Sequence, residues 1–162
     1  MKSRNALLFS FAVGVAIFAA VSHSPGQPRD GGPDARAQIL ARLEEIQNAA
    51  QSLDVDKVFG FVLENDGGAM ISNGQLFLTR KDALDSTKAG FQGLNKISYK
   101  FDRQNVTILS PTAALAVGEG SSSATLDDGR VRTTRFAQSV VFVLTNGEWK
   151  VFHSHRSFPP SN

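Results

Sequence analysis

The C-terminal stretch NGEWKVFHSHRSFPP, Asn146 to Pro160, holds two histidines, an arginine and the only tryptophan of the chain. His153 and His155 are two residues apart, so on a strand both imidazoles project from the same face. A His-x-His pair can bind zinc, but a metal needs a third ligand, and Glu119 is the only carboxylate expected on a neighbouring strand. We therefore expect structural or interface histidines, with no metal ion and no cofactor.

Arg156 is the candidate for binding an anion. A guanidinium group can hold a carboxylate through two parallel hydrogen bonds. An ion pair at the end of the sheet, with an acid from the first helix, is an equally good interpretation of this residue.

Tyr99, the only tyrosine of the chain, could polarise a substrate carbonyl in an isomerase-type reaction. Such chemistry also needs a general base. Asp102 points away from Tyr99 because side chains alternate along a strand, and no other acid is clearly placed inside. The pattern favours Tyr99 as a core residue whose hydroxyl bonds to a neighbour. Whether the protein is an enzyme stays open.

Three helices are predicted in the first half of the chain. Apolar residues recur at steps of three and four after Asp34, which predicts an amphipathic helix with Asp34 as its N-cap. Asp54 can cap a second, shorter helix, and Thr79 with Asp82 forms a capping box for a third. Between the second and third helices, Asn73-Gly74 predicts a tight β-hairpin.

The second half is predicted to form a meander of four long strands, with polar and apolar residues alternating around Tyr99. Gly118 and Gly120 inside a strand predict a sharp bend. Helices followed by strands in series indicate an α+β domain with an antiparallel sheet. The turns between the strands are Ser110-Pro111, Asp127-Asp128-Gly129 and Asn146-Gly147.

This order of elements and the ending NGEWKVFHSHRS resemble the SnoaL-like domains of the nuclear transport factor 2-like (NTF2-like) superfamily. The ending is especially similar to that of the association (hub) domain of calcium/calmodulin-dependent protein kinase II. The resemblance covers residues 36–158. It implies a cone-shaped fold of three helices against a strongly curved antiparallel sheet, a pocket beneath the sheet, and frequent dimers.

The same resemblance implies no single activity, because the superfamily includes isomerases, dehydratases, cyclases and non-catalytic oligomerisation modules. The hub domain lines its pocket with arginines at the positions that match Val140 and Arg156. Only Arg156 is kept in this sequence. The match implies that these two positions share a face of the sheet.

The last hairpin decides which side chains line the pocket. A two-residue Asn146-Gly147 turn would place Val140 beside His153, whereas a three-residue loop from Thr145 to Gly147 would pair Val140 with Phe152. We prefer the three-residue loop, because it gathers an apolar wall and a few polar groups on one face. The predicted pocket residues are Arg156, Ser154, Gln138, Phe152 and Tyr99.

The opposite face of the sheet would then carry Trp149, His153 and His155 among small residues. A tryptophan and two histidines suit a subunit interface better than open solvent. We expect a homodimer formed through this face.

The N-terminus has the pattern of an export signal. Lys2 and Arg4 precede an uncharged run from Ala6 to Val21, which is shorter than the roughly 20 residues of a spanning helix. Ala20-x-Ser22 then resembles a cleavage site. We predict a signal peptide over residues 1–22, a disordered spacer over 23–33 and the SnoaL-like domain over 34–160, in a periplasmic or extracellular protein. An uncleaved anchor is the alternative; after cleavage no stable membrane anchor is expected.

Composition excludes some classes of protein. The formal net charge is +2, and it falls to zero once Lys2 and Arg4 are removed with the leader. No basic stripe remains for nucleic acid, and the absence of cysteine excludes a disulfide framework.

The leading hypothesis is an exported SnoaL-like domain that binds a small, partly apolar molecule in its cone, with an anion as one option. One alternative is an isomerase, dehydratase or cyclase that uses Tyr99 with an acid the sequence does not place. The other is a purely structural oligomerisation module. A carboxylate or histidine beside Tyr99 would favour chemistry, and a filled cone would favour the structural module.

Overall fold

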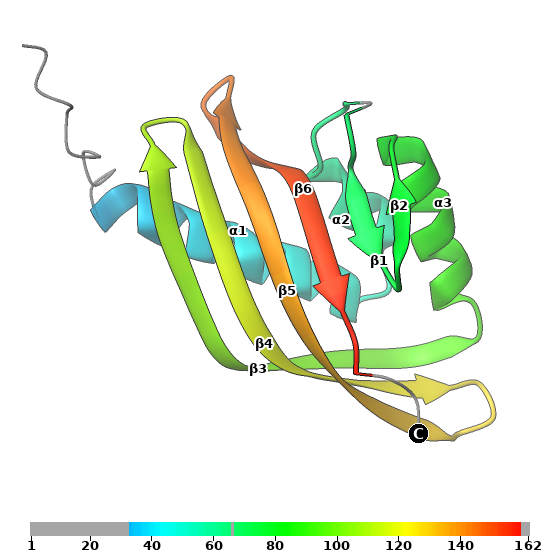
Figure 1. Cartoon of the computed structure of the whole chain (residues 1–162). Coiled ribbons are helices and arrows are strands. Elements are labelled where there is room, and N and C mark those ends of the chain that lie inside the picture. Colours follow the sequence, from blue (N-terminus) through cyan, green and yellow to red (C-terminus); the bar gives the residue numbers. More distant parts are fainter. Residues whose placement is uncertain (1–32, 66, 160–162) are drawn as a thin grey trace, which may run out of the picture.

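The computed structural model describes residues 33–65 and 67–159 (Figure 1). The predicted signal peptide, and the spacer up to residue 32, lie outside the described residues. No helix in the described part of the chain is long and apolar enough to cross a membrane. The elements are α1 (Pro33–Gln51), α2 (Val55–Gly60), β1 (Met70–Ser72), β2 (Gln75–Phe77), α3 (Arg80–Phe91), β3 (Leu94–Ser110), β4 (Ala113–Leu126), β5 (Val131–Thr145) and β6 (Glu148–Ser157).

The predicted caps at Asp54 and Thr79 and the first hairpin are present. The Asp54 carboxylate accepts the backbone N–H of Lys57 at 2.9 Å, and the Thr79 hydroxyl accepts that of Asp82 at 3.1 Å. Asn73 has a positive φ of 52° between β1 and β2, as a tight hairpin turn requires. α1 begins at Pro33, since proline is well suited to the first helical position. Asp34 therefore lies in the first turn of the helix, and its predicted place as the N-cap is wrong.

The strands form one six-stranded sheet in the order β2-β1-β6-β5-β4-β3. All neighbouring pairs are antiparallel except β1 and β6, which run parallel. The prediction of a wholly antiparallel sheet missed this pair. The short hairpin joins the free edge of β6, where the backbone N–H of Ser154 donates to the carbonyl of Ala69 at 3.2 Å.

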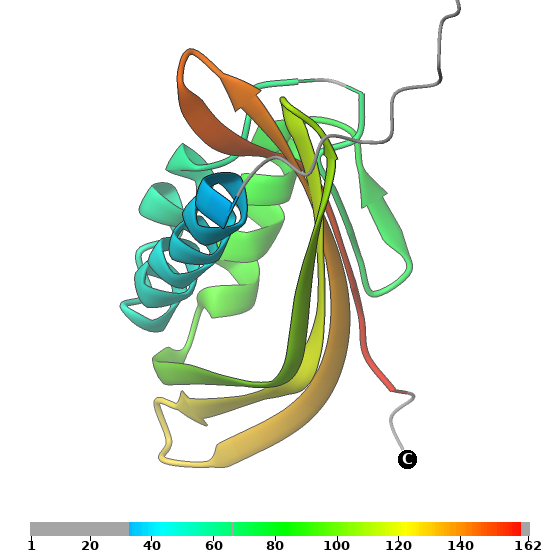
Figure 2. The same ribbon diagram turned by 90° about the vertical axis from the view of Figure 1, so that its left-hand side faces the viewer.

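The helices lie on the concave side of the sheet (Figure 2). Ile39 and Leu43 of α1 pack into a core with Phe142 of β5 and with Trp149 and Val151 of β6. A second cluster lies between α2, α3 and the β1–β2 hairpin, and contains Val55, Phe59, Ala69, Phe77 and Ala83. The first cluster holds α1 against the long strands, and the second holds α2 and α3 against the short hairpin.

The long strands bend sharply, as Gly118 and Gly120 predicted (Figures 1 and 2). β3 carries a bulge between Phe101 and Arg103, opposite the two glycines. A Cβ atom on Gly120 would overlap the backbone of Lys100. Glycine is therefore required where β4 approaches β3 most closely.

The β5–β6 hairpin corrects the predicted register. Thr145 pairs with Glu148 around a two-residue Asn146-Gly147 turn, so the preferred three-residue loop is wrong. Both turn residues have positive φ, 51° and 79°, as a type I′ turn requires. The extra residue sits further along β6 instead, as a bulge at Phe152.

The bulge changes which way the side chains of β6 point. Before it, Trp149 faces inward and is 4% exposed, so its predicted place on the outer face is wrong. Phe152 lies at the bulge and is 39% exposed, so it does not face the cone as predicted. After the bulge, Ser154 and Arg156 pair with Val140 and Gln138, which restores the predicted face for these residues.

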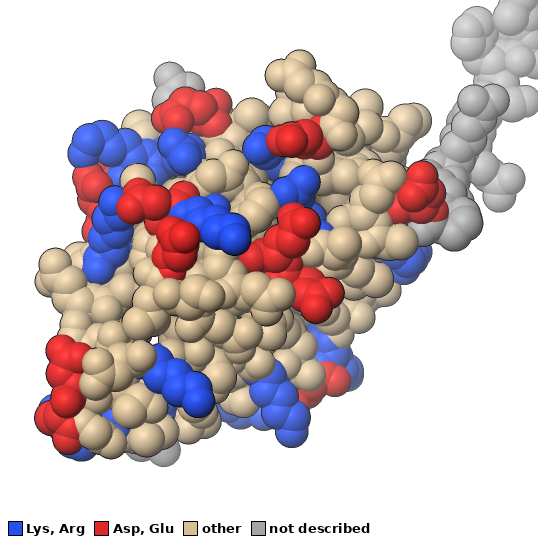
Figure 3. Space-filling view, turned by 180° about the vertical axis from the view of Figure 1, so that it is seen from behind, with Lys and Arg blue, Asp and Glu red and all other residues tan. Residues whose placement is uncertain are grey.

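Charged side chains of both signs lie intermingled on the face opposite to that of Figure 1. Figure 3 shows Lys and Arg next to Asp and Glu over the upper part of this face, without a continuous stripe of one sign.

Candidate ligand-binding cavity

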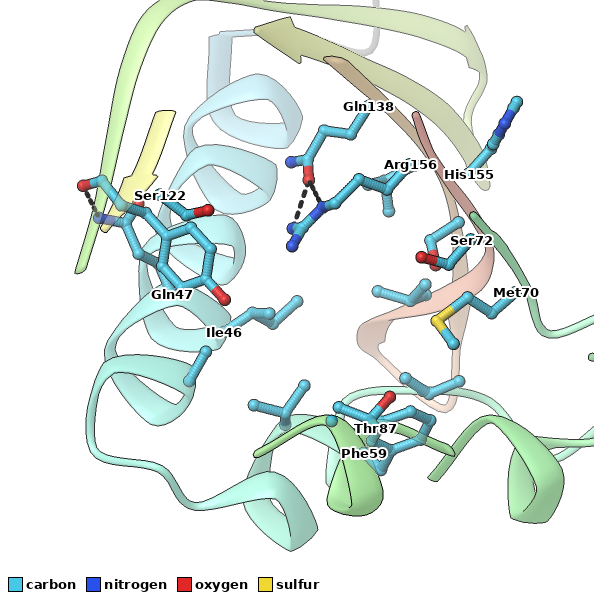
Figure 4. A pocket seen from close by; sticks show the side chains of 18 of the residues that line it. Ile46, Gln47, Phe59, Met70, Ser72, Thr87, Ser122, Gln138, His155 and Arg156 are labelled. Carbon is cyan, nitrogen blue, oxygen red and sulfur yellow. Dashed lines mark hydrogen bonds between the residues drawn. The ribbon is translucent and has the colours of Figure 1, made fainter. Parts of the chain in front are cut away.

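The cone encloses a cavity of about 430 Å³ between the helices and the concave face of the sheet (Figure 4). Every helix and every strand contributes at least one side chain to its wall. Much of this wall is apolar, including Leu43, Ile46, Val58, Phe59, Met70, Phe77, Phe91, Ile97, Phe101 and Val140. Polar groups are few by comparison and come mainly from Gln47, Ser72, Thr87, Tyr99, Ser122, Gln138, Ser154 and Arg156.

Arg156 and Gln138 face each other across the β5–β6 ladder. They are register partners, and the Gln138 side-chain oxygen accepts hydrogen bonds from Nε and Nη2 of Arg156 at 3.2 and 2.7 Å. Figure 4 shows the guanidinium directed into the cavity and held by this amide. The pair is part-buried.

Two aromatic rings form a corner around the guanidinium. The Arg156 Cζ atom lies 4.9 Å from the ring centroid of Phe136 and 5.5 Å from that of Tyr99. The two rings are nearly perpendicular, at 80°, with centroids 6.2 Å apart. Ring faces attract a cation and fix its position, so the guanidinium is held without an acidic partner.

No aspartate or glutamate is among the described residues that line the cavity. Arg156 also makes no ion pair with any carboxylate of residues 33–65 and 67–159. His155 borders the cavity, but its ring points away from the interior in Figure 4. Within the described lining, Tyr99 therefore has no acid beside it that could act as a general base.

The two histidines of the His-x-His pair lie near the β1–β2 hairpin. Nδ1 of His153 is 2.9 Å from the carbonyl oxygen of Gly68. His155 is the register partner of Ser139 on one side and of Ile71 on the other. No cluster of three metal-binding side chains occurs among the residues that the structure describes.

Two glutamines of α1 hold the backbone of Tyr99 in place. The Tyr99 N–H donates to the side-chain oxygen of Gln51 at 3.2 Å, and the Tyr99 carbonyl accepts from Nε2 of Gln47 at 3.4 Å. The sequence reasoning missed both residues. Their spacing of four on one helix face was the available signal.

Of the predicted pocket residues, Arg156, Ser154, Gln138 and Tyr99 come together around one cavity, whereas Phe152 does not line it. The reasoning from sequence also missed the wall contributed by α2, α3 and the β1–β2 hairpin, including Phe59, Met70 and Thr87. The sequence predicts these positions only as core residues, because no local pattern shows that the core contains a cavity.

Solved structures with this architecture include proteins of the NTF2-like superfamily. A proposed dehydratase of the NTF2-like family from Streptomyces avermitilis has a TM-score of 0.71 at 16% identity, over 80% of this chain and 100% of that chain. An NTF2-like superfamily protein from Salmonella enterica serovar Typhimurium has a TM-score of 0.70 at 16% identity, over 80% and 94% of the two chains. The association domain of CaMKII from C. elegans has a TM-score of 0.60 at 19% identity, over 76% and 96%.

The family follows from the sequence. The model of the SnoaL-like domain family matches residues 39–161, and the chain belongs to this family. The predicted resemblance and the α+β cone fold are thereby confirmed. No curated protein matches the chain by sequence.

Proposed function

We propose that this SnoaL-like domain binds a small, partly apolar molecule in its cone. The observation that carries the proposal is the open cavity of about 430 Å³ with a largely apolar wall and one guanidinium. Ligand pockets commonly measure about 300–1,000 Å³ and combine an apolar wall with few polar groups. A purely structural module would gain stability by filling this space with side chains.

Binding is better supported than catalysis. Elimination and isomerisation reactions need a group that removes a proton from the substrate. The described lining offers no carboxylate for this role, although structural neighbours include a proposed dehydratase. An enzyme that uses Tyr99 stays the second candidate on the strength of that fold alone.

A matched pair of glycine substitutions tests the binding proposal. Gly90 lines the cavity and Gly60 does not, and a Cβ on either residue meets nothing within 4 Å. A library of small aromatic and aliphatic acids, amides and alcohols is screened by thermal shift on wild type, Gly90→Trp and Gly60→Trp. We expect compounds that bind wild type, bind more weakly to Gly90→Trp, and bind to Gly60→Trp as they do to wild type. Hits that survive both substitutions would place binding outside the cavity, and a library without hits would contradict the proposal.

We further propose that the domain forms a homodimer through the outer face of its sheet. Val117 is 41% exposed and lies in the row that continues through Ser139 to His155. The neighbour from C. elegans is named an association domain. Trp149 is buried against α1 and takes no part in this surface.

Light scattering tests the dimer. We expect a dimer at a protein concentration of roughly tens of micromolar, which is sufficient to populate a subunit interface of ordinary affinity. Val117→Arg should give a monomer, whereas Leu40→Arg on α1 should leave the dimer intact, since the two residues are similarly exposed at 41% and 43%. A wild-type monomer at this concentration would remove the interface role from His153 and His155.

We also propose that the protein is exported and that the mature chain begins near His23. The basis is the charged start, the apolar run and the Ala20-x-Ser22 pattern. Mass spectrometry of protein from the cell envelope or medium identifies the first residue of the mature chain. Retention of residues 1–22 would indicate an anchored protein instead.

A further inference from the structure

Only one edge of the Arg156 guanidinium is occupied by protein. A guanidinium offers five N–H groups in one plane. Nε and Nη2 both donate to the single side-chain oxygen of Gln138, which uses the edge nearest the side chain. The terminal edge, formed by Nη1 and the second hydrogen of Nη2, makes no further hydrogen bond with a described residue. No buried side-chain nitrogen among the described residues lacks a partner, so this edge faces open space in the cavity.

Gln138 fixes the direction of the guanidinium without neutralising its charge. A glutamate of the same length would form an internal ion pair with Arg156, and the described lining would then lose the one full charge that points into the cavity. The amide holds the fork in its plane, while Phe136 and Tyr99 hold it through their ring faces. The cavity therefore keeps a positive charge whose free edge has a defined direction.

The opposite end of the cavity is mostly apolar, and the hydroxyl of Thr87 there already donates to the carbonyl of Ala83 at 2.8 Å. In Figure 4, Arg156 and Gln138 lie at one end, and Phe59 lies at the other, with Ile46 and Met70 on the walls between. A molecule bound with one end on Arg156 would place its remainder against these apolar side chains.

We propose that the ligand is a monocarboxylate with an apolar body, and that Gln138 is the positioning residue that turns the free edge of Arg156 toward it. This rests on the proposed function. The two coplanar oxygens of a carboxylate match the two parallel N–H groups of the terminal edge. A second negative charge would be removed from water without a partner, because the described lining holds no second cation aimed inward.

Three ligands with the same phenyl ring distinguish the effect of charge on affinity from the effect of shape. Benzoate carries the carboxylate, benzamide is its neutral counterpart, and phenyl phosphate carries two charges. Titration calorimetry should show that wild type binds benzoate about tenfold or more tightly than benzamide, as a charge-assisted contact implies. Phenyl phosphate should bind more weakly than benzoate.

Gln138→Glu is the decisive variant. It keeps the length of the side chain and its contact with Arg156, but cancels the charge. We expect benzoate affinity to fall tenfold or more while benzamide affinity changes little. Gln138→Met removes the acceptor and keeps the charge, so the benzoate-to-benzamide ratio should fall only in part. A purely structural role for Gln138 would change both affinities together in each variant.

Each outcome decides a separate point. If Gln138→Glu binds benzoate as wild type does, or if wild type binds benzamide equally well, the monocarboxylate proposal is wrong and binding in the cone still stands. If neither ligand binds and the wider library also gives no hit, both proposals fail. Circular dichroism of each variant confirms that it is folded, and Gln138→Met provides the second measurement if Gln138→Glu is not.

Discussion

The indole Nε1 of Trp149 donates a hydrogen bond of 3.0 Å to the side-chain oxygen of Gln38. This part-buried contact joins β6 to α1 at the border of the main core, in which the Trp149 ring packs with Ile39 and Leu43. Leu43 also lines the cavity. The pair therefore fixes the helix that forms one wall of the cone.

Trp149→Phe should lower the free energy of unfolding by about 2 kcal/mol, because it removes one ring from the core and the indole hydrogen bond. Gln38→Met keeps the ring but removes the acceptor, and should cost about 1 kcal/mol. Urea unfolding followed by circular dichroism measures both. A Trp149→Phe variant as stable as wild type would contradict the core position of the indole.

The bend of the sheet depends on Gly120 more than on Gly118. A Cβ on Gly120 would overlap the carbonyl oxygen of Lys100, whereas one on Gly118 would lie 3.1 Å from the carbonyl oxygen of Arg103. Gly120→Ala should destabilise the fold by about 3 kcal/mol or more, and Gly118→Ala by about 1 kcal/mol, because backbone must shift in the first case. Thermal unfolding of the two variants shows which substitution destabilises the fold more. Equal stabilities would contradict the larger role of Gly120 in the bend.

The same substitution should have opposite effects at two other glycines. Gly147 has a positive φ of 79° in the β5–β6 turn, so Gly147→Ala should cost about 1–2 kcal/mol. Gly90 lies in α3, and a Cβ there meets nothing within 4 Å, so Gly90→Ala should stabilise by about 0.5 kcal/mol. Chemical denaturation measures both changes. A Gly147→Ala variant as stable as wild type would argue against the type I′ turn.

Local patterns predicted most of the fold. The caps at Asp54 and Thr79 and the Asn73-Gly74 hairpin depend on residues within a few positions of one another, and the structure contains all three. The parallel pairing of β1 with β6 brings Met70 beside Ser154. Such a contact depends on how the whole chain folds, and local spacing does not encode it.

Only part of the cavity lining could be predicted from local spacing. Gln138, Ser154 and Arg156 were placed on the correct face, although the hairpin loop was wrong, because the turn and the bulge at Phe152 together shift the strand by two positions from the predicted pairing. An even shift preserves the face. Trp149 precedes the bulge and was therefore assigned to the wrong side.

The same hairpin predicts a small pH effect on stability. Lys150 lies 2.8 Å from Glu148 and lowers the pKa of the Glu148 carboxyl below its ordinary value, first by a hydrogen bond and then by its charge. The pair stabilises the fold fully above the pKa of the unfolded chain, and this contribution is lost as pH falls through the lower folded pKa. Glu148→Gln should be slightly less stable than wild type at pH 7 and equal to it near pH 2. In high salt the difference at pH 7 should also shrink, since the pair is exposed.

β3 forms the edge of the sheet that lies opposite β2. A long unpaired edge strand can pair with another chain. α1 covers part of this edge through the contacts of Gln51 and Gln47 with the backbone of Tyr99. The two glutamines protect different groups: Gln51 accepts the N–H, and Gln47 donates to the carbonyl.

Hydrogen exchange can therefore separate the two contacts. Gln51→Ala should speed exchange of the Tyr99 amide about fivefold, the equivalent of a lost hydrogen bond of about 1 kcal/mol. Gln47→Ala should leave that amide nearly as protected as in wild type, because the bond from Tyr99 to Gln51 remains. Each variant should lose a similar amount of global stability, so a general loosening of α1 would accelerate the amide equally in both. Equal acceleration would show that the glutamines act only by holding the helix, whereas a selective effect of Gln51→Ala would show that its side chain closes the edge of the sheet at the wall of the cavity.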